Sequence, residues 1–180
     1  MASRLFPLLL GPGFESLPEA CRAMHGFDNP SSAKGHADIT RGSNFLARFM
    51  GAMARMPQAG KKVPLEVRFE PASPGIETWE RNFDGSRFRS RLTIDQGLLR
   101  EVLFPLHLWF RLVASADGVH WVFHRAKVLG LIPLPGALAP RIEAREWSVD
   151  GRYHFLASVG MPLIGLIVRY EGSLDAPKAL

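Results

Sequence analysis

Three Asp-Gly pairs constrain the fold of this chain more than any other feature of its sequence. Asp84-Gly85, Asp117-Gly118 and Asp150-Gly151 each lie between two runs in which apolar and polar residues alternate. An Asp-Gly pair favours a two-residue hairpin turn, and alternation with a period of two indicates strands with one buried and one solvated face. Because the runs leave no room for crossover helices, we predict a mainly antiparallel meander.

The 180 residues fit one domain, with a mostly helical cap over residues 1–60, an antiparallel sheet over 61–173 and a tail over 174–180. The sheet is expected to hold about eight to ten strands, and a sheet of that size tends to curl. We therefore predict an α+β fold in which N-terminal helices pack on a large curved, mainly antiparallel β-sheet or a partly closed β-barrel.

The predicted cap contains three short helices. They begin near Leu5, at Pro18, and at Ser43 or Asn44, and a short strand is expected over His36–Arg41. The third helix, which Pro57 ends, has an apolar stripe that is predicted to face the core, as such stripes usually do. The stripe consists of Phe45, Leu46, Phe49, Met50 and Met53. A functional hydrophobic groove is the alternative.

The composition narrows the class of protein. Hydrophobic residues make up 47% and charged residues 22% of the chain, which is typical of a globular protein. A single cysteine, Cys21, cannot form an internal disulfide, so we expect a reducing compartment and a cytoplasmic location. The net charge of +5 comes from arginines scattered singly among acids, which argues against a nucleic-acid partner. No apolar run approaches the ~20 residues of a membrane span, and peripheral contact with a membrane stays open.

Searches for catalytic and cofactor motifs give no match. The sequence contains no GxGxxG, GxxxxGK[ST], GxSxG or HExxH motif. His120 and His124 share a strand face but are expected to lie about 13 Å apart, too far to bind one metal ion. We therefore predict no catalytic residue, no cofactor and no metal site, and we favour a protein that is not an enzyme.

Arg87, Arg89 and Arg91 form the most conspicuous charge pattern, because alternate positions place all three on one strand face. This row is able to bind a phosphate or a polyanion. The Asp84-Gly85 turn, however, sets a register in which the arginines face, in order, Asn82, Glu80 and Thr78. A solvated outer charge ladder is therefore the favoured interpretation.

The opposite face of this hairpin, and the apolar face at the Asp150-Gly151 turn, carry charged residues among apolar ones. Buried charges are costly unless paired, so Arg81 and Glu146 are expected either to form a plain ion pair or to meet the polar head of a ligand. In an open interior, Arg81 is the residue that would hold a carboxylate, with Glu77 or Glu146 and Tyr153 as orienting partners. The candidate ligand-binding residues are Glu77, Trp79, Arg81, Phe88, Glu146 and Tyr153.

The uncharged segment from Leu129 to Pro140 is interrupted by three prolines and is predicted to be a loop. An exposed apolar loop suggests a ligand portal or a contact with a membrane or another protein. Alternatively, the loop folds back over the open end of the core. Ile132 and Leu134, together with the three arginines of the outer ladder, are the candidate surface-contact residues.

Several local strings, spread over nearly the whole chain, resemble a bacterial family of uncharacterised proteins, the domain of unknown function 4166 family. They are Leu5-Phe6-Pro7 with Leu10-Gly11, Arg41-Gly42, Val67-Arg68-Phe69, Trp79 and Arg81 before Phe83, Phe88-Arg89-Ser90, Glu143-Ala144-Arg145-Glu146-Trp147, Asp150-Gly151-Arg152, and Arg169-Tyr170 with Gly172. The family has no established activity, so the resemblance implies no catalytic residues. Such domains also occur fused behind NAD(P)-binding domains similar to saccharopine dehydrogenase, which implies an accessory role beside small-molecule or lipid metabolism.

These observations lead to three functional hypotheses. The leading one is a non-catalytic domain whose curved sheet encloses a mostly apolar pocket for a hydrophobic or lipid-like small molecule. The alternative is a protein-interaction module that docks on an NAD(P)-dependent oxidoreductase through the Leu129 to Pro140 loop and the arginine ladder. The third is an enzyme in which Arg81 and Glu146 act, with a carboxylate as general acid.

Overall fold

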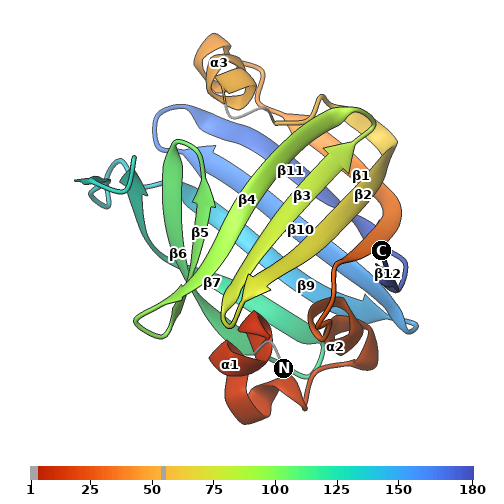
Figure 1. The fold of residues 1–180 in the computed structure, drawn as a ribbon. Helices are drawn as coiled ribbons and strands as arrows, with labels where there is room; N and C mark the ends of the chain where they lie inside the picture. Colours follow the sequence, from red (N-terminus) through yellow and green to blue (C-terminus); the bar gives the residue numbers. More distant parts are fainter. Residues whose placement is uncertain (1–3, 54–55) are drawn as a thin grey trace.

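The computed structural model describes residues 4–53 and 56–180. In this part of the chain, ten antiparallel strands form a closed barrel, because the last long strand pairs with the first (Figure 1). In the order of the sheet they are β1 (Ser31–Arg41), β2 (Gly60–Ser73), β3 (Ile76–Phe83), β4 (Ser86–Asp95), β5 (Leu98–Leu103), β6 (Leu106–Ala114), β7 (Gly118–Val128), β9 (Arg141–Val149), β10 (Arg152–Met161) and β11 (Gly165–Leu174). Thus the predicted antiparallel fold is confirmed.

Two of the three predicted hairpin turns form at the predicted residues. Asp84 and Gly85 have φ values of 47° and 93°, and Asp150 and Gly151 have φ values of 50° and 74°. Positive φ at both central residues is the signature of a type I′ turn, whose twist matches that of the flanking strands. The register that follows is also as predicted, since Arg89 lies opposite Glu80.

The third turn is shifted by one residue. Ser115 and Gly118 exchange both of their backbone hydrogen bonds, so Ala116 and Asp117 are the central residues and Gly118 already belongs to β7. Gly118 is needed for a different reason. A Cβ atom there would lie 1.9 Å from the carbonyl oxygen of Glu146 on β9, so only glycine permits this close approach of the strands.

Helices lie at both ends of the barrel. Helix α1 (Leu5–Leu10), a 3-10 turn (Gly11–Phe14) and α2 (Glu19–His25) close one end, while α3 (Phe45–Met53) lies at the other (Figure 1). We call the segment 5–25 the plug, because it inserts buried side chains into the barrel core: Leu5, Phe6, Phe14, Leu17, Cys21 and Met24. None of the helices in the described residues is long and apolar enough to cross a membrane.

The predicted helical cap over residues 1–60 is interrupted by a full barrel strand, β1, which is longer than the expected His36–Arg41. It pairs with β2 on one side and with β11 on the other. Glycines on both sides of this seam allow close approach: a Cβ at Gly35 would lie 1.9 Å from the carbonyl oxygen of Ser173. Residues 1–3 and 54–55 of the cap lie outside the described residues.

Two further strands have only two residues each. Strand β12 (Lys178–Ala179), in the segment predicted as a tail, pairs with the beginning of β1. Strand β8 (Ile132–Pro133) pairs with the end of β7, within the segment predicted as a loop.

The predicted orientation of α3 is wrong. Its large apolar side chains point to solvent, with exposed fractions of 83% for Phe45, 52% for Phe49 and 61% for Met53, and only Ala47 and Gly51 are buried. The reason is that the helix packs through its small residues. A Cβ at Gly51 would lie 2.2 Å from a guanidinium nitrogen of Arg41, so a larger residue at this position would have to displace the Arg41 side chain.

The N-cap of α3 is one of the two predicted residues. The side chain oxygen of Asn44 accepts a hydrogen bond of 2.7 Å from the backbone N–H of Ala47. The amide nitrogen of the same side chain donates to the carbonyl of Ile164, in the turn between β10 and β11. Asn44 therefore begins the helix and also fixes it to the barrel end.

Candidate functional site

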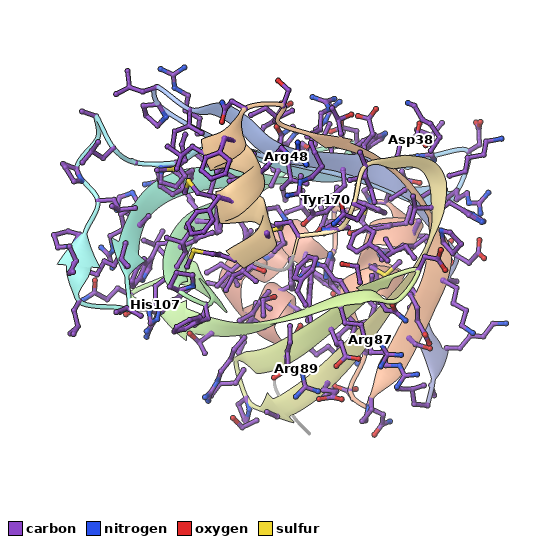
Figure 2. The ribbon with its side chains drawn as sticks, turned by 90° about the horizontal axis from the view of Figure 1, so that it is seen from above. Asp38, Arg48, Arg87, Arg89, His107 and Tyr170 are labelled. Carbon is purple, nitrogen blue, oxygen red and sulfur yellow. The ribbon has the colours of Figure 1, made fainter. Side chains whose placement is uncertain are left out.

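The barrel interior contains a cavity of about 110 Å³, whose lining extends from Met56, which hydrogen-bonds to Gly51 of α3, to Glu146, which contacts the plug. Its walls are mainly apolar, and they are formed by alternate residues of most strands, including Leu65, Phe83, Leu103, Ile142, Phe155, Val159 and Tyr170. Figure 2 looks onto this end of the barrel, with Tyr170 inside the ring of strands, beside α3, and with Arg87 and Arg89 outside it. The cavity therefore extends towards the end that carries α3.

Arg81 on β3 is the main cationic group in the cavity wall. Its Nη1 donates a hydrogen bond of 2.9 Å to Oγ of Ser90, and its Nη2 lies 3.5 Å from Oε1 of Glu101 on β5. The guanidinium carbon also lies 5.1 Å from the ring centroid of Trp79 and 5.3 Å from that of Phe88, so two predicted site residues hold it by cation–π contacts.

The partner of Arg81 therefore differs from the one that the sequence suggested. The expected pair of Arg81 with Glu146 does not form; Arg81 pairs with Glu101 instead. The sequence analysis did not select Glu101, although the sequence contained a signal for it. Glu101 alternates with Leu99 and Leu103 on β5 and therefore shares their inward face.

Glu146 on β9 pairs with a residue of the plug. Its Oε2 lies 2.6 Å from Nε2 of His25, the last residue of α2, and both side chains are buried. The His25 ring also stacks on Phe6, with ring centroids 3.6 Å apart. This hydrogen bond and the stacking join both plug helices to the barrel wall. Sequence reasoning missed His25, because a single histidine in a short helix gives no local signal of a buried partner.

Glu77 on β3 lies on the plug side of the interior rather than in the cavity wall. Its Oε1 accepts a hydrogen bond of 3.2 Å from the backbone N–H of Leu5, and its Oε2 accepts one of 3.0 Å from Nε1 of Trp79. Burial raises the pKa of Glu77 above its ordinary value, and the hydrogen bond from Trp79 offsets part of this rise. Glu77 therefore anchors α1 to the barrel.

The raised pKa of Glu77 predicts a specific pH dependence. Because the folded state holds this proton more tightly than the unfolded chain, stability from Glu77 is lost as the pH rises above 4.5, the ordinary value of the group. The free energy of unfolding of the wild type, minus that of Glu77→Gln, is expected to fall as the pH rises from 4.5 towards 7. Urea unfolding at a series of pH values measures this difference.

Asp28→Asn is a control with the opposite sign. The hydrogen bond from Arg4 lowers the pKa of Asp28, so the stability that this carboxylate provides is lost as the pH falls below 3.8. The wild-type minus variant difference should therefore rise with pH for Asp28. If the difference in unfolding free energy between the wild type and Glu77→Gln stayed constant or rose with pH, it would contradict the raised pKa of Glu77.

Two tyrosines lie in the cavity wall, and both are kept neutral. Burial raises the pKa of Tyr153 well above its usual value, and the nearby Glu146 raises it further. Burial also raises the pKa of Tyr170, which sequence reasoning did not select although Phe83 packs edge-on against it at 5.3 Å between ring centroids. The two phenols are therefore uncharged, and each is able to donate or accept a hydrogen bond.

Two further kinds of candidate site are the thiol of Cys21 and clusters of metal-binding side chains. Burial raises the pKa of the Cys21 thiol to about 12, which makes it a poor nucleophile. Within residues 4–53 and 56–180, no group of three or more His, Cys, Asp and Glu side chains is placed to hold a metal ion.

The predicted surface residues divide into two groups. Arg87, Arg89 and Arg91 lie on the outer face of β4, as expected, and Arg89 lies 3.4 Å from Glu70 and 3.6 Å from Glu80. These contacts agree with the solvated charge ladder that we favoured. In the loop after β7, Ile132 is exposed, whereas Leu134 is half-buried and packs against the core.

Fold and interior together define the class: a closed antiparallel β-barrel with a plugged end, an apolar cavity, a buried hydrogen bond between His25 and Glu146, and an ion pair between Arg81 and Glu101. The sequence model of a family described as a domain of unknown function (DUF4166) matches residues 17–174, and the chain belongs to this family. This confirms the resemblance found in the sequence. No curated protein matches the chain.

Proposed function

We propose that the barrel binds a hydrophobic or lipid-like small molecule in its interior. The observation that carries this proposal is the apolar cavity of about 110 Å³ in the barrel interior. Apolar cavities of about 150 Å³ stay dry and bind molecules such as benzene. A cavity of this size suits a small ring or one short alkyl segment, and a longer ligand would extend out towards α3.

The charges in the wall favour an uncharged polar head. Arg81 is already paired with Glu101, so the pair as a whole is neutral, and a carboxylate bound to Arg81 would be repelled by Glu101. A hydroxyl or carbonyl group would accept a hydrogen bond from Arg81 without that repulsion. We therefore propose an alcohol, ester or amide head rather than the carboxylate that the sequence suggested.

Mass spectrometry of the purified protein, first native and then after organic extraction, tests whether a small molecule co-purifies. A bound species of defined stoichiometry would support the proposal and identify the ligand. Titration with dodecanol and with dodecanoic acid then tests the head group, and we expect the alcohol to bind more tightly. If neither compound binds and no species co-purifies, the proposed function is wrong.

Replacing both members of the ion pair separates binding from folding. Removing a buried pair together is neutral or stabilising, so Arg81→Met/Glu101→Leu should remain folded. Loss of about one hydrogen bond should weaken dodecanol binding roughly tenfold. The matched control is Arg89→Met/Glu80→Leu, an equivalent pair on the outer face, which should bind as the wild type does.

A second candidate function is an interaction module that acts beside an NAD(P)-dependent oxidoreductase. The observation that favours it is the exposure of Leu131 and Ile132, at 80% and 60%, in the loop after β7. Ile132→Asp should abolish capture of such an enzyme while leaving dodecanol binding unchanged.

A further inference from the structure

The outward face of α3 is not explained by the folding of this chain. An amphipathic helix normally packs its large apolar residues on the core, but α3 packs Ala47 and Gly51 there and exposes the larger ones. We call the exposed set the α3 face; it consists of Phe45, Leu46, Phe49 and Met53, together with Leu163 of the adjacent turn.

Leu163 belongs to this face for a structural reason. Asn44 at the beginning of α3 donates to the carbonyl of Ile164, so the turn between β10 and β11 lies beside the helix. Leu163 is fully exposed, and its φ is 64°, a left-handed conformation that is strained for a leucine and that glycine adopts freely. A leucine at this position does not contribute to the packing of the fold. We therefore take its exposed side chain as an indication of a role in binding.

The charges around the α3 face are basic. Arg48 on the helix and Arg141 at the beginning of β9 are both exposed, and Arg141 lies opposite Gly160 at the end of β10, next to the turn of Leu163. The segments 42–53 and 161–165 contain Arg48 and no acidic residue.

We propose that the α3 face inserts into the surface of an anionic lipid bilayer. Apolar side chains on a short surface helix, flanked by basic residues, are the features by which proteins bind such membranes. A second copy of the chain fits less well, because it would bring the same basic residues together. This proposal goes beyond the binding of a small molecule and does not depend on that binding. The two sites are nevertheless close, because α3 lies at the end of the barrel towards which the cavity extends.

Co-sedimentation with vesicles tests this docking. We expect the protein to bind vesicles of phosphatidylglycerol and phosphatidylcholine more strongly than vesicles of phosphatidylcholine alone. Phe45→Ser/Leu163→Gly should lower the partition coefficient by at least about tenfold. Arg48→Gln should lower it about fivefold, and only at low salt.

The variants also separate docking from stability. Because glycine relieves the strain at position 163, Leu163→Gly should melt no lower than the wild type while binding vesicles less. Val122→Ser removes an exposed apolar side chain from the barrel wall and should bind as the wild type does. The proposal is overturned if the wild type does not bind anionic vesicles, or if Val122→Ser lowers binding as much as Phe45→Ser/Leu163→Gly.

Two further outcomes identify the cause of a failure. Concentration-dependent dimers that Phe45→Ser abolishes, without vesicle binding, would assign the α3 face to a second copy and overturn the bilayer. Extraction and dodecanol titration are done without vesicles. A protein that binds dodecanol but no vesicles therefore rejects the docking and retains the proposed function.

Discussion

His25→Ala is expected to lower the free energy of unfolding by about 3–5 kcal/mol. The substitution leaves Glu146 buried without its partner, which lies 2.6 Å away in the wild type, and removing one member of a buried pair has costs of this order. It also removes the ring on which Phe6 stacks. Urea unfolding followed by tryptophan fluorescence measures the loss, since Trp79 lies beside His25.

His120→Ala is the matched control. His120 is exposed on β7, and its replacement should change the free energy of unfolding by less than about 0.5 kcal/mol. If His25→Ala lost no more stability than this control, the hydrogen bond between His25 and Glu146 would contribute nothing to docking of the plug, and the other contacts of the plug would hold it.

Phe6→Ala is expected to cost a similar amount, about 3–5 kcal/mol. Phe6 is fully buried, and its ring lies 5.8 Å from Trp79 and 5.8 Å from Trp121 between centroids. Truncation leaves a cavity at the centre of the plug, where several rings lose contacts together. The loss of stability is measured by thermal or urea unfolding of the variant and of the wild type under the same conditions.

The chain offers a control with the same substitution at the other end of the barrel. Phe45→Ala removes an equal side chain that is 83% exposed, so it should leave stability nearly unchanged. Cys21 adds a local readout: its thiol should react slowly with Ellman's reagent in the wild type and faster in Phe6→Ala. Equal thiol reactivity in the two proteins would contradict the role of Phe6 in holding the plug closed.

The local features of the barrel were predictable because they depend on short-range rules. The turn at Asp84-Gly85 sets the register of β3 and β4, and alternation then places Arg81 inside and Arg89 outside. The inward position of Glu146 and Tyr153 follows from the turn at Asp150-Gly151 in the same way. Within one hairpin, the two residues of the turn were therefore sufficient to predict which side chains face inward.

The contacts between distant strands and helices were not predictable in this way. Arg81 pairs with Glu101, two strands along the sheet, and Glu146 pairs with His25, 121 residues earlier in the chain. Hairpin rules do not specify such pairs, because they depend on how the barrel closes and where the plug enters. The orientation of α3 failed for a related reason: periodicity identifies an apolar face but not what covers it.

The position of β1 has a consequence for how the chain is made. Strand β1 pairs with β2, which follows it closely, but also with β11, whose residues 165–174 leave the ribosome much later. Its second row of hydrogen bonds therefore forms only after all the other long strands of the barrel have been synthesised, and the plug that leads into β1 cannot dock fully before then. During synthesis the aromatic residues of the plug stay accessible to chaperones, so a segment that precedes the barrel in the sequence is among the last to be completed.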